Sequence, residues 1–438
     1  MNIFRSSVFS ILGTLFGFVI SIGSGVLIAR LLGPAGKGEI YLMTQLISLI
    51  ILLMSLGFSS SYIYHIKSNK ISSSVALSHA LILCIFIGVI LYLNYLSGYF
   101  LVKLLTLDSL SDSRMLVMTA LIGMGLIATL FTSILQSQDE GVAKYSIYSI
   151  FADIFYASGL IWFVLVMNWG VNGVLLALGA QVTVRVLLVG KAIYSLADLS
   201  ASFNFTNITS TLFKYGIVAF VANVAMTSLF RLDIFVINRF LDANAIGLYS
   251  VAVNLGELML LIPSAIGVAL FPYLTSLSNN ERAEKICFVT RVGIFLGIFC
   301  ALIFGLFGQF VINLLFGLEF SSSYASLLIL LPGLIALSTV FGFTNYYSSI
   351  GRPSVNAIAF SLSALANLGL NVWLVPAYGI AGAAASSTFV YVITMIGYVI
   401  HFNSIEKVSL KNICIITKQD INTLFVGGKN ILTKEGSI

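Results

Sequence analysis

The amino-acid sequence predicts an all-α membrane protein, and three observations support that prediction. The chain has 438 residues, of which 59% are hydrophobic and only 9% are charged. The apolar residues come in long uninterrupted runs, and a membrane-spanning helix needs about 20 of them in succession. These runs do not alternate apolar with polar residues, as transmembrane strands would. The expected fold is therefore a helical bundle in a bilayer.

About twelve such runs follow one another, joined by short polar connections. The first run is too long for a signal-peptide core and lacks a small-x-small cleavage site, so we predict that it is a membrane-spanning helix and not a signal peptide. Most of the chain is then expected to lie in the membrane. The predicted spans are 8–29, 41–63, 76–98, 115–135, 145–167, 171–194, 213–237, 245–271, 290–315, 324–347, 355–375 and 380–401.

The distribution of basic residues predicts the orientation. With a cytoplasmic N-terminus, fifteen of the 22 lysine and arginine residues fall in inner connections, and five, including Lys37, fall in outer ones. Because inner connections carry an excess of lysine and arginine in membrane proteins, both termini are expected in the cytoplasm. This bias accounts for the net charge of +6, and no soluble domain offers a basic surface to nucleic acid.

An internal repeat is visible in two pairs of segments. The segments IARLLGPAGKGEIY (28–41) and INRFLDANAIGLY (237–249) share arginine, leucine and glycine at their third, fifth and eleventh places. The two arginines, Arg30 and Arg239, are 209 residues apart, and the same offset separates GVNG at 170 from GIAG at 379. Two independent pairs with one offset indicate duplication of a six-helix unit.

The duplication predicts the domain organisation. Residues 1–200 and 201–402 are expected to form two six-helix lobes, and residues 403–438 a cytoplasmic tail. Each half has an even number of spans, so the halves are parallel repeats around a central cavity, where transporters place their substrates.

Two charged residues stand close together inside the apolar segment TSLFRLDIFVINRFL. A charge in the hydrocarbon region costs about 2.5–3.5 kcal/mol, so such residues usually face the bundle interior or a wet cavity. Arg231 and Asp233 are two positions apart, which places them about 200° apart on a helix. We expect them to serve different partners. Each could line a cavity or could pin a neighbouring helix, and for Asp233 the two readings are equally supported.

Three further ionisable residues are embedded in predicted spans. Asp153 and Arg185 lie about nine residues from the same membrane face, so we expect a salt bridge between adjacent helices. Glu257 lies near mid-membrane before Pro263. Its carboxyl could bind a coupling proton or sodium ion, or could be a protonated group held by neighbours.

The repeat mates Arg30 and Arg239 close the outer ends of equivalent helices. Ordinary interfacial snorkelling explains each one alone. Their repetition at the mouth of the expected cavity favours a positively charged lining, and the guanidinium fork suits phosphate.

Several motifs of soluble chemistry are absent from the sequence. The glycine-rich GPAGKGE at 33–39 does not fit the nucleotide-binding pattern. The cysteines form no C-x-x-C pair, and His65, His79 and His401 have no metal-ligand spacing. No nucleophile motif is present. We therefore predict no enzyme activity, no cofactor and no metal site.

Four segments together resemble one family, over about residues 5 to 402. They are ARLLGPAGKGEIY after the first helix, FRLDIFVINRFLDANAIGLYSVA, LLIPSAIGVALFPYL, and NLGLNVWLVPAYGIAGAAASS at 367–387. They resemble the bacterial polysaccharide flippases, the O-antigen and capsular repeat-unit translocases. These belong to the multidrug/oligosaccharidyl-lipid/polysaccharide exporter superfamily. The Arg-x-Asp and following Gly-x-Tyr pattern favours the polysaccharide branch.

The resemblance implies a pair of six-helix lobes that work by alternating access in the bacterial cytoplasmic (inner) membrane. The implied substrate is a short oligosaccharide on undecaprenyl pyrophosphate, moved from the cytoplasmic to the outer leaflet. Implied partners are this lipid-linked glycan, membrane lipid, a coupling proton or sodium ion, and a polysaccharide polymerase. Cationic cavities in this branch fit Arg30, Arg231 and Arg239.

Three alternatives stay open at this point. A drug or cation antiporter of the same superfamily would favour a carboxylate-dominated cavity, and the embedded charges here are mixed. A membrane glycan polymerase or ligase would carry a large outer loop, and the outer connections here are short. Lipid II flipping is chemically close, although flippases of that kind usually have extra spans.

Overall fold

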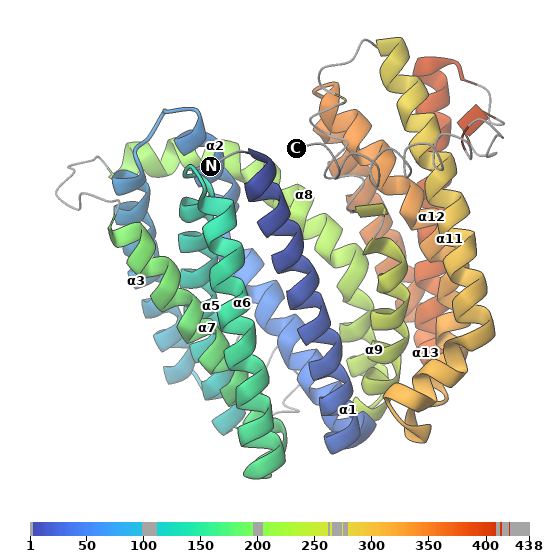
Figure 1. Ribbon diagram of the computed structural model, residues 1–438, viewed down its shortest axis with the longest axis horizontal. Helices are drawn as coiled ribbons and strands as arrows, with labels where there is room; N and C mark the ends of the chain where they lie inside the picture. The colour runs from blue at the N-terminus through green and yellow to red at the C-terminus, as the bar shows by residue number, and fades with distance from the viewer. Residues whose placement is uncertain are drawn as a thin grey trace, which may run out of the picture. The chain divides into compact units, whose positions relative to one another are not determined.

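The computed structural model describes residues 3–98, 112–195, 205–261, 263–264, 274, 279–408, 412–413 and 420. All the regular elements in this part of the chain are helices, as predicted (Figure 1). The chain forms two compact units, Met1–Gly247 and Leu248–Ile438. These packing units do not coincide with the expected halves 1–200 and 201–402, which were drawn from duplication, and those boundaries stay a prediction.

The first unit contains the helices from the N-terminus to the start of α9. Helix α1 contacts α5, α6, α7 and α8, so it lies at the centre of this unit. Their bounds are α1 Ile3–Ser55, α2 Phe58–Lys67, α3 Ser73–Leu96, α5 Asp112–Gln136, α6 Gly141–Leu160 with a π-helical end Ile161–Val166, α7 Gly170–Tyr194, and α8 Phe205–Phe240.

The second unit is built on three long helices. Helix α12 packs against both α11 and α13. Their bounds are α11 Asn279–Leu315, α12 Ser323–Ser349 and α13 Pro353–Glu406, with short 3-10 turns at Leu258–Leu260 and Leu318–Phe320. Helix α9, Ala243–Glu257, runs across the boundary between the two units.

Ten helices in the described ranges are long and apolar enough to cross a membrane. Two of them are bent and each corresponds to two predicted spans, so the ten helices account for all twelve. Helix α1 is bent at Gly33 (φ 64°, ψ −175°) and α13 at Gly379 (φ 59°, ψ −141°). The second half of predicted span 245–271 lies mostly outside the described residues.

Two details of the predicted spans are wrong. Residues 30–40 are not a polar connection, because helix continues on both sides of Gly33. Pro34 disfavours helical geometry at the residue before it, and glycine alone adopts this conformation without strain. The predicted span 41–63 is interrupted where Leu56 (φ 45°) and Gly57 (φ 76°) turn the chain.

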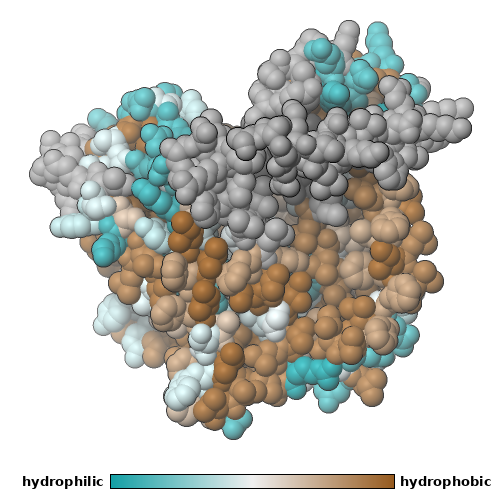
Figure 2. All heavy atoms as spheres, viewed as in Figure 1, coloured by the Kyte–Doolittle hydropathy of each residue, from teal (hydrophilic) through white to brown (hydrophobic). Residues whose placement is uncertain are grey.

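Large apolar side chains cover the outside of the helices. On α11 the exposed residues Phe299, Leu302, Leu306 and Phe310 recur every three or four positions, which forms one stripe along the helix. Figure 2 shows hydrophobic residues over most of the visible face away from the helix ends. Soluble proteins rarely expose such continuous apolar surface, so these faces contact lipid and the chain is a multi-pass membrane protein.

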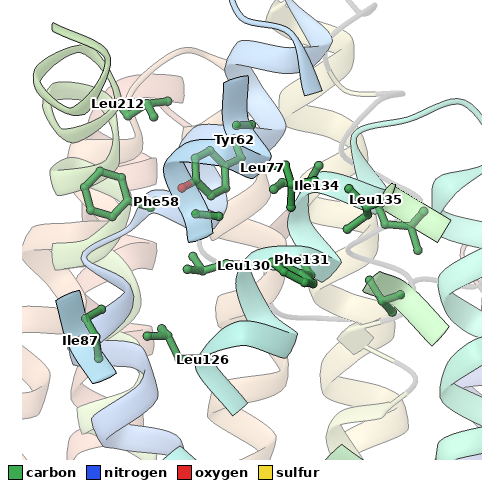
Figure 3. Packing of buried hydrophobic residues seen from close by; sticks show 14 of the residues in the cluster. Phe58, Tyr62, Leu77, Ile87, Leu126, Leu130, Phe131, Ile134, Leu135 and Leu212 are labelled. Carbon is green, nitrogen blue, oxygen red and sulfur yellow. The ribbon is translucent and has the colours of Figure 1, made fainter. Parts of the chain in front are cut away.

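One apolar core of the first unit joins five helices (Figure 3). Phe58 and Tyr62 of α2 are inserted between α3, α5 and α8, and Tyr62 has no exposed surface. This core fixes the end of α8, the helix that carries Arg231 further along. The buried residues labelled in the figure are Phe58, Tyr62, Leu77, Ile87, Leu126, Leu130, Phe131, Ile134, Leu135 and Leu212.

Candidate functional site

Arg231 of α8 lies against the second half of α1. Its Nη1 donates a hydrogen bond to the hydroxyl oxygen of Tyr41 at 3.1 Å. The arginine is half-buried, and Tyr41 is 9% exposed. The two residues are 190 positions apart in sequence. The fold therefore places a guanidinium group inside the first unit, at a contact between two predicted spans.

Asp233 is more deeply buried than Arg231. Its side chain is 3% exposed, and Oδ1 accepts a hydrogen bond at 2.8 Å from the backbone N–H of Ile234. A carboxylate that accepts from a backbone amide in a buried position is held in place. That Arg231 and Asp233 serve different partners stays a prediction.

A close contact between residues at equivalent positions of the two repeat copies joins α1 to α9. A Cβ added to Gly38 would lie 1.7 Å from the carbonyl oxygen of Ala243, and one added to Gly247 would lie 1.9 Å from that of Pro34. Gly38 and Gly247 are 209 residues apart, and so are Pro34 and Ala243. The contact is thus symmetric under the duplication. We call these four residues the glycine crossing.

The repeat position that bends α1 is filled differently in the second copy. Gly33 corresponds to Asp242 by the offset of 209 residues. The Asp242 Oδ1 accepts a hydrogen bond at 2.9 Å from the backbone N–H of Ala245, which caps the start of α9. A glycine kink in one copy and an aspartate cap in the other therefore precede the glycine crossing.

Arg30 and Arg239, the other two candidate substrate residues, are exposed. Arg239 lies in the last turn of α8, where a cation is favoured by the helix dipole. Their lining of a cavity stays a prediction.

Lys37 is a cation whose placement was predicted wrongly. The sequence assigned it to an outer connection, yet it is 5% exposed within α1. Its Nζ donates a hydrogen bond at 3.1 Å to the carbonyl oxygen of Gly25, on the other side of the kink at Gly33. Lys37 therefore ties the two halves of α1 together.

The salt bridge predicted between Asp153 and Arg185 is confirmed. Arg185 Nη2 lies 3.6 Å from Asp153 Oδ1, and Gln181 Nε2 donates to the same oxygen at 2.7 Å. The bridge links α6 to α7. Gly17 of α1 makes room for the carboxylate, because a Cβ there would lie 3.0 Å from Asp153 Oδ2. Three helices therefore meet at this pair.

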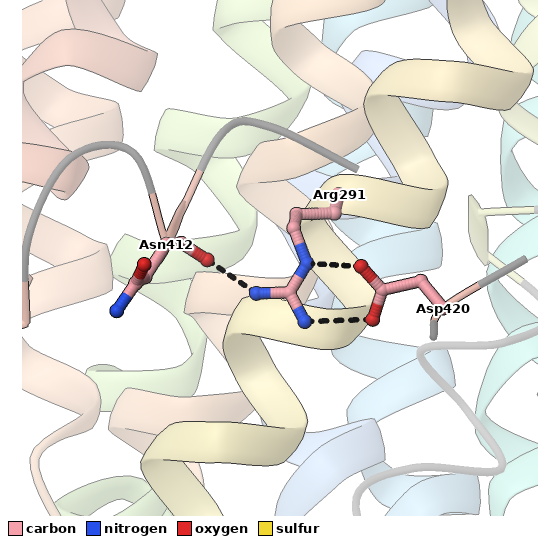
Figure 4. Close-up of polar contacts among 3 residues, drawn as sticks. All are labelled: Arg291, Asn412 and Asp420. Atoms are coloured by element: carbon pink, nitrogen blue, oxygen red, sulfur yellow. Dashed lines mark hydrogen bonds and ion pairs between the residues drawn. The ribbon is translucent and has the colours of Figure 1, made fainter. Parts of the chain in front are cut away.

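Glu257 ends α9 and is half-buried in the second unit. Ion coupling and a structural role for its side chain both stay predictions. Elsewhere in the second unit, Arg291 of α11 forms a two-pronged ion pair with Asp420, at 2.7 and 2.8 Å (Figure 4). Arg291 also donates to the backbone oxygen of Asn412. This cluster attaches the segment after α13 to α11.

A buried polar chain near the end of the first unit was missed by sequence reasoning. His79 Nδ1 lies 2.7 Å from the hydroxyl of Tyr62, and His79 Nε2 lies 2.9 Å from the hydroxyl of Thr209. Thr209 donates its own proton to the carbonyl of Phe205, so its oxygen accepts a hydrogen bond from His79 Nε2–H. The three residues come from α2, α3 and α8.

Sequence reasoning also missed Tyr41 and Gln181. Like the polar chain, they are polar residues within apolar runs and belong to no motif that marks a site.

Within the described residues, no group of three or more His, Cys, Asp or Glu side chains could hold a metal ion. What the first unit offers chemically is a hydrogen-bonded guanidinium within the span formed by α8. Such a group binds anions, and phosphate in particular, by paired hydrogen bonds.

Comparisons with known proteins show one matching family and several relatives. The family described as "Polysaccharide biosynthesis protein" matches residues 3–278. A probable low-salt glycan biosynthesis flippase of Haloferax volcanii is 23% identical over 430 residues, covering 94% of this chain and 86% of that protein. A Shigella flexneri protein named as an O-antigen transporter is 23% identical over 405 residues, covering 88% and 94%.

Two solved structures share the fold over nearly the whole chain. A lipid II flippase in an inward closed conformation has a TM-score of 0.75 and 16% identity, covering 96% of this chain and 92% of that one. An inward-facing multidrug resistance transporter of the MATE family has a TM-score of 0.72 and 15% identity, covering 90% and 96%. At these identities the likeness establishes the fold alone.

Proposed function

Because the chain belongs to the polysaccharide biosynthesis protein family, we propose that it is a flippase for lipid-linked glycans. The proposed substrate is an oligosaccharide repeat unit on undecaprenyl pyrophosphate. The protein moves it from the cytoplasmic to the outer leaflet of the bacterial cytoplasmic membrane by alternating access. Both termini lie in the cytoplasm, and a proton or sodium ion is coupled to the movement through Asp233 or Glu257.

A protein is needed for this step because of the cost of moving polar groups through hydrocarbon. Each polar group that loses its hydrogen bonds to water in an apolar medium costs about 2–7 kcal/mol, and an unpaired charge costs more. A diphosphate with several sugars presents many such groups. The lipid tail can stay in the bilayer while the headgroup passes along polar side chains of the protein.

The observation that carries the proposal is the guanidinium of Arg231 within a membrane-spanning helix. An intramembrane arginine costs about 2.5–3.5 kcal/mol and is rarely kept without a functional partner. Its hydrogen bond to Tyr41, at 3.1 Å, orients it to donate paired hydrogen bonds to two phosphate oxygens. In this proposal Arg231 binds the pyrophosphate, and Arg30 and Arg239 attract it at the outer end of the path.

Complementation tests the proposal. A strain that lacks its own repeat-unit flippase receives the gene together with the matching sugar pathway, at matched membrane levels of each variant. Surface glycan and lipid-linked repeat unit are both measured. We expect the wild type to restore surface glycan, and Arg231→Ala to leave the repeat unit on its lipid carrier.

Arg114→Ala is the matched control, because Arg114 is half-buried like Arg231 but forms an ion pair with Glu39 at 2.8 Å. It is not one of the proposed substrate residues, so this variant should complement like the wild type. If the wild type itself restores no surface glycan, the flippase proposal fails. Resistance to cationic drugs in the same strain would then identify the antiporter alternative.

A further inference from the structure

We infer that Tyr41 is a positioning residue for Arg231, holding its guanidinium in the orientation that binds the diphosphate of the substrate. This inference rests on the proposed function and adds a second residue to that site. Tyr41 was absent from the sequence-based candidates, because a tyrosine in an apolar run gives no signal of its own.

The direction of the hydrogen bond is fixed by chemistry. A guanidinium has only donors, so the Tyr41 oxygen must accept from Arg231 Nη1 across the 3.1 Å contact. A long arginine side chain carries about 2 kcal/mol of rotamer entropy. A bond to a buried hydroxyl removes part of that freedom before a ligand arrives. Preorganisation of this kind increases affinity without adding a contact to the ligand.

Tyr41 can do this because its own position is rigid. It lies in a run of buried residues, with Ile40 5%, Leu42 4% and Met43 0% exposed. It also lies three residues after Gly38, so both are on the same side of α1. The glycine crossing presses Gly38 against Ala243, just beyond the end of α8.

Binding of undecaprenyl pyrophosphate to the purified full-length protein in nanodiscs tests the inference. Tyr41→Phe keeps the ring and removes the acceptor. We expect about tenfold weaker binding, since a hydrogen bond to a charged group is involved. In an Arg231→Ala background the same change should weaken binding no further, because Tyr41 affects the ligand only through Arg231.

Tyr398→Phe is the matched control, because Tyr398 is 2% exposed and loses a 3.0 Å hydrogen bond to Asn356 Oδ1 in the second unit. It should lower the thermal midpoint about as much as Tyr41→Phe and leave the affinity unchanged. Tyr41→Gln, which keeps an acceptor oxygen, should bind better than Tyr41→Phe. If the phenylalanine variant does not fold, Tyr41→Gln is compared with Tyr41→Leu, which also keeps no acceptor, and the glutamine variant should bind more tightly.

The outcomes separate this inference from the proposed function. If the wild type binds the lipid and Tyr41→Phe binds it equally well, Tyr41 has no positioning role and the flippase proposal stands. Additive losses in the double variant would also overturn the inference. If the wild type binds no undecaprenyl pyrophosphate, the proposed substrate is wrong and the role of Tyr41 falls with it.

Discussion

Substitution of Gly38 by alanine tests the glycine crossing directly. The added Cβ would lie 1.7 Å from the Ala243 oxygen, whereas real Cβ contacts essentially never fall below 3.0 Å. The backbones must therefore separate by about 1.3 Å, the difference between those two distances. Both the carbonyl and the neighbouring Gly247 N–H, 2.8 Å from the same Cβ, are backbone groups that cannot rotate away. Overpacking of this kind costs about 1–3 kcal/mol, and we expect the upper end.

The assay is reversible unfolding in mixed micelles, which gives the free energy of unfolding for each variant. Gly23→Ala is the control on the same helix, because a Cβ at Gly23 meets no atom within 4 Å. It should stabilise the protein by up to about 1 kcal/mol through helix propensity. Gly247→Ala should destabilise like Gly38→Ala, since its Cβ would lie 1.9 Å from the Pro34 oxygen.

The double variant adds a second criterion. Once one alanine has pushed the helices apart, the other alanine meets less obstruction. The stability lost in the double variant should therefore be smaller than the sum of the losses in the two single variants. Equal stability of Gly38→Ala and Gly23→Ala would refute the reasoning, because it would mean that α1 and the start of α9 do not approach closely.

Three other predictions concern ion pairs and backbone conformation. Asp153→Asn removes the charged partner of Arg185 and should lower the free energy of unfolding by about 1.5–3 kcal/mol, with no loss beyond this when Arg185→Gln is added. Gly379→Ala forces a side chain into φ 59° and should cost about 1–2 kcal/mol in the same assay. Asp420→Asn leaves the Arg291 guanidinium, 12% exposed, without its carboxylate, and should speed tryptic cleavage of the segment after α13; an unchanged cleavage rate would show that the pair does not hold that segment.

Much of the fold followed from local pattern. Membrane spans are set by the length of apolar runs, and that property can be read without knowledge of neighbours. The offset of 209 residues also pairs glycines that have the same backbone conformation. Gly170 and Gly379, which it pairs, both have positive φ, at 55° and 59°. Their neighbours Gly173 and Gly382 both approach a backbone carbonyl, which explains why the repeat preserved them.

The failures were of a different kind. The kink at Gly33 was taken as a polar connection because glycine, proline and lysine are loop residues elsewhere. Inside a protein-packed membrane region, helix can resume after such a bend when its polar groups find partners. Lys37 shows this, since its ammonium reaches the Gly25 carbonyl across the kink.

The candidate site could be predicted only in part. Charged residues in apolar runs are conspicuous, so Arg231, Asp233 and the Asp153–Arg185 pair were found from sequence, and equal depth was enough to predict that pair. Tyr41 could not be found this way. Its role depends on a contact 190 residues away, which arises from the packing of α1 on α8.

Reconstitution of the purified protein in liposomes tests the flippase proposal most directly. The liposomes carry an undecaprenyl-pyrophosphate-linked oligosaccharide in both leaflets, and a glycosidase added outside digests only the outward-facing sugar. We predict that the wild type allows digestion to proceed beyond the outer-leaflet half, whereas Arg231→Ala and protein-free liposomes stop there. Digestion that stops at the outer-leaflet half with folded wild-type protein and an imposed proton or sodium gradient would contradict the proposed function.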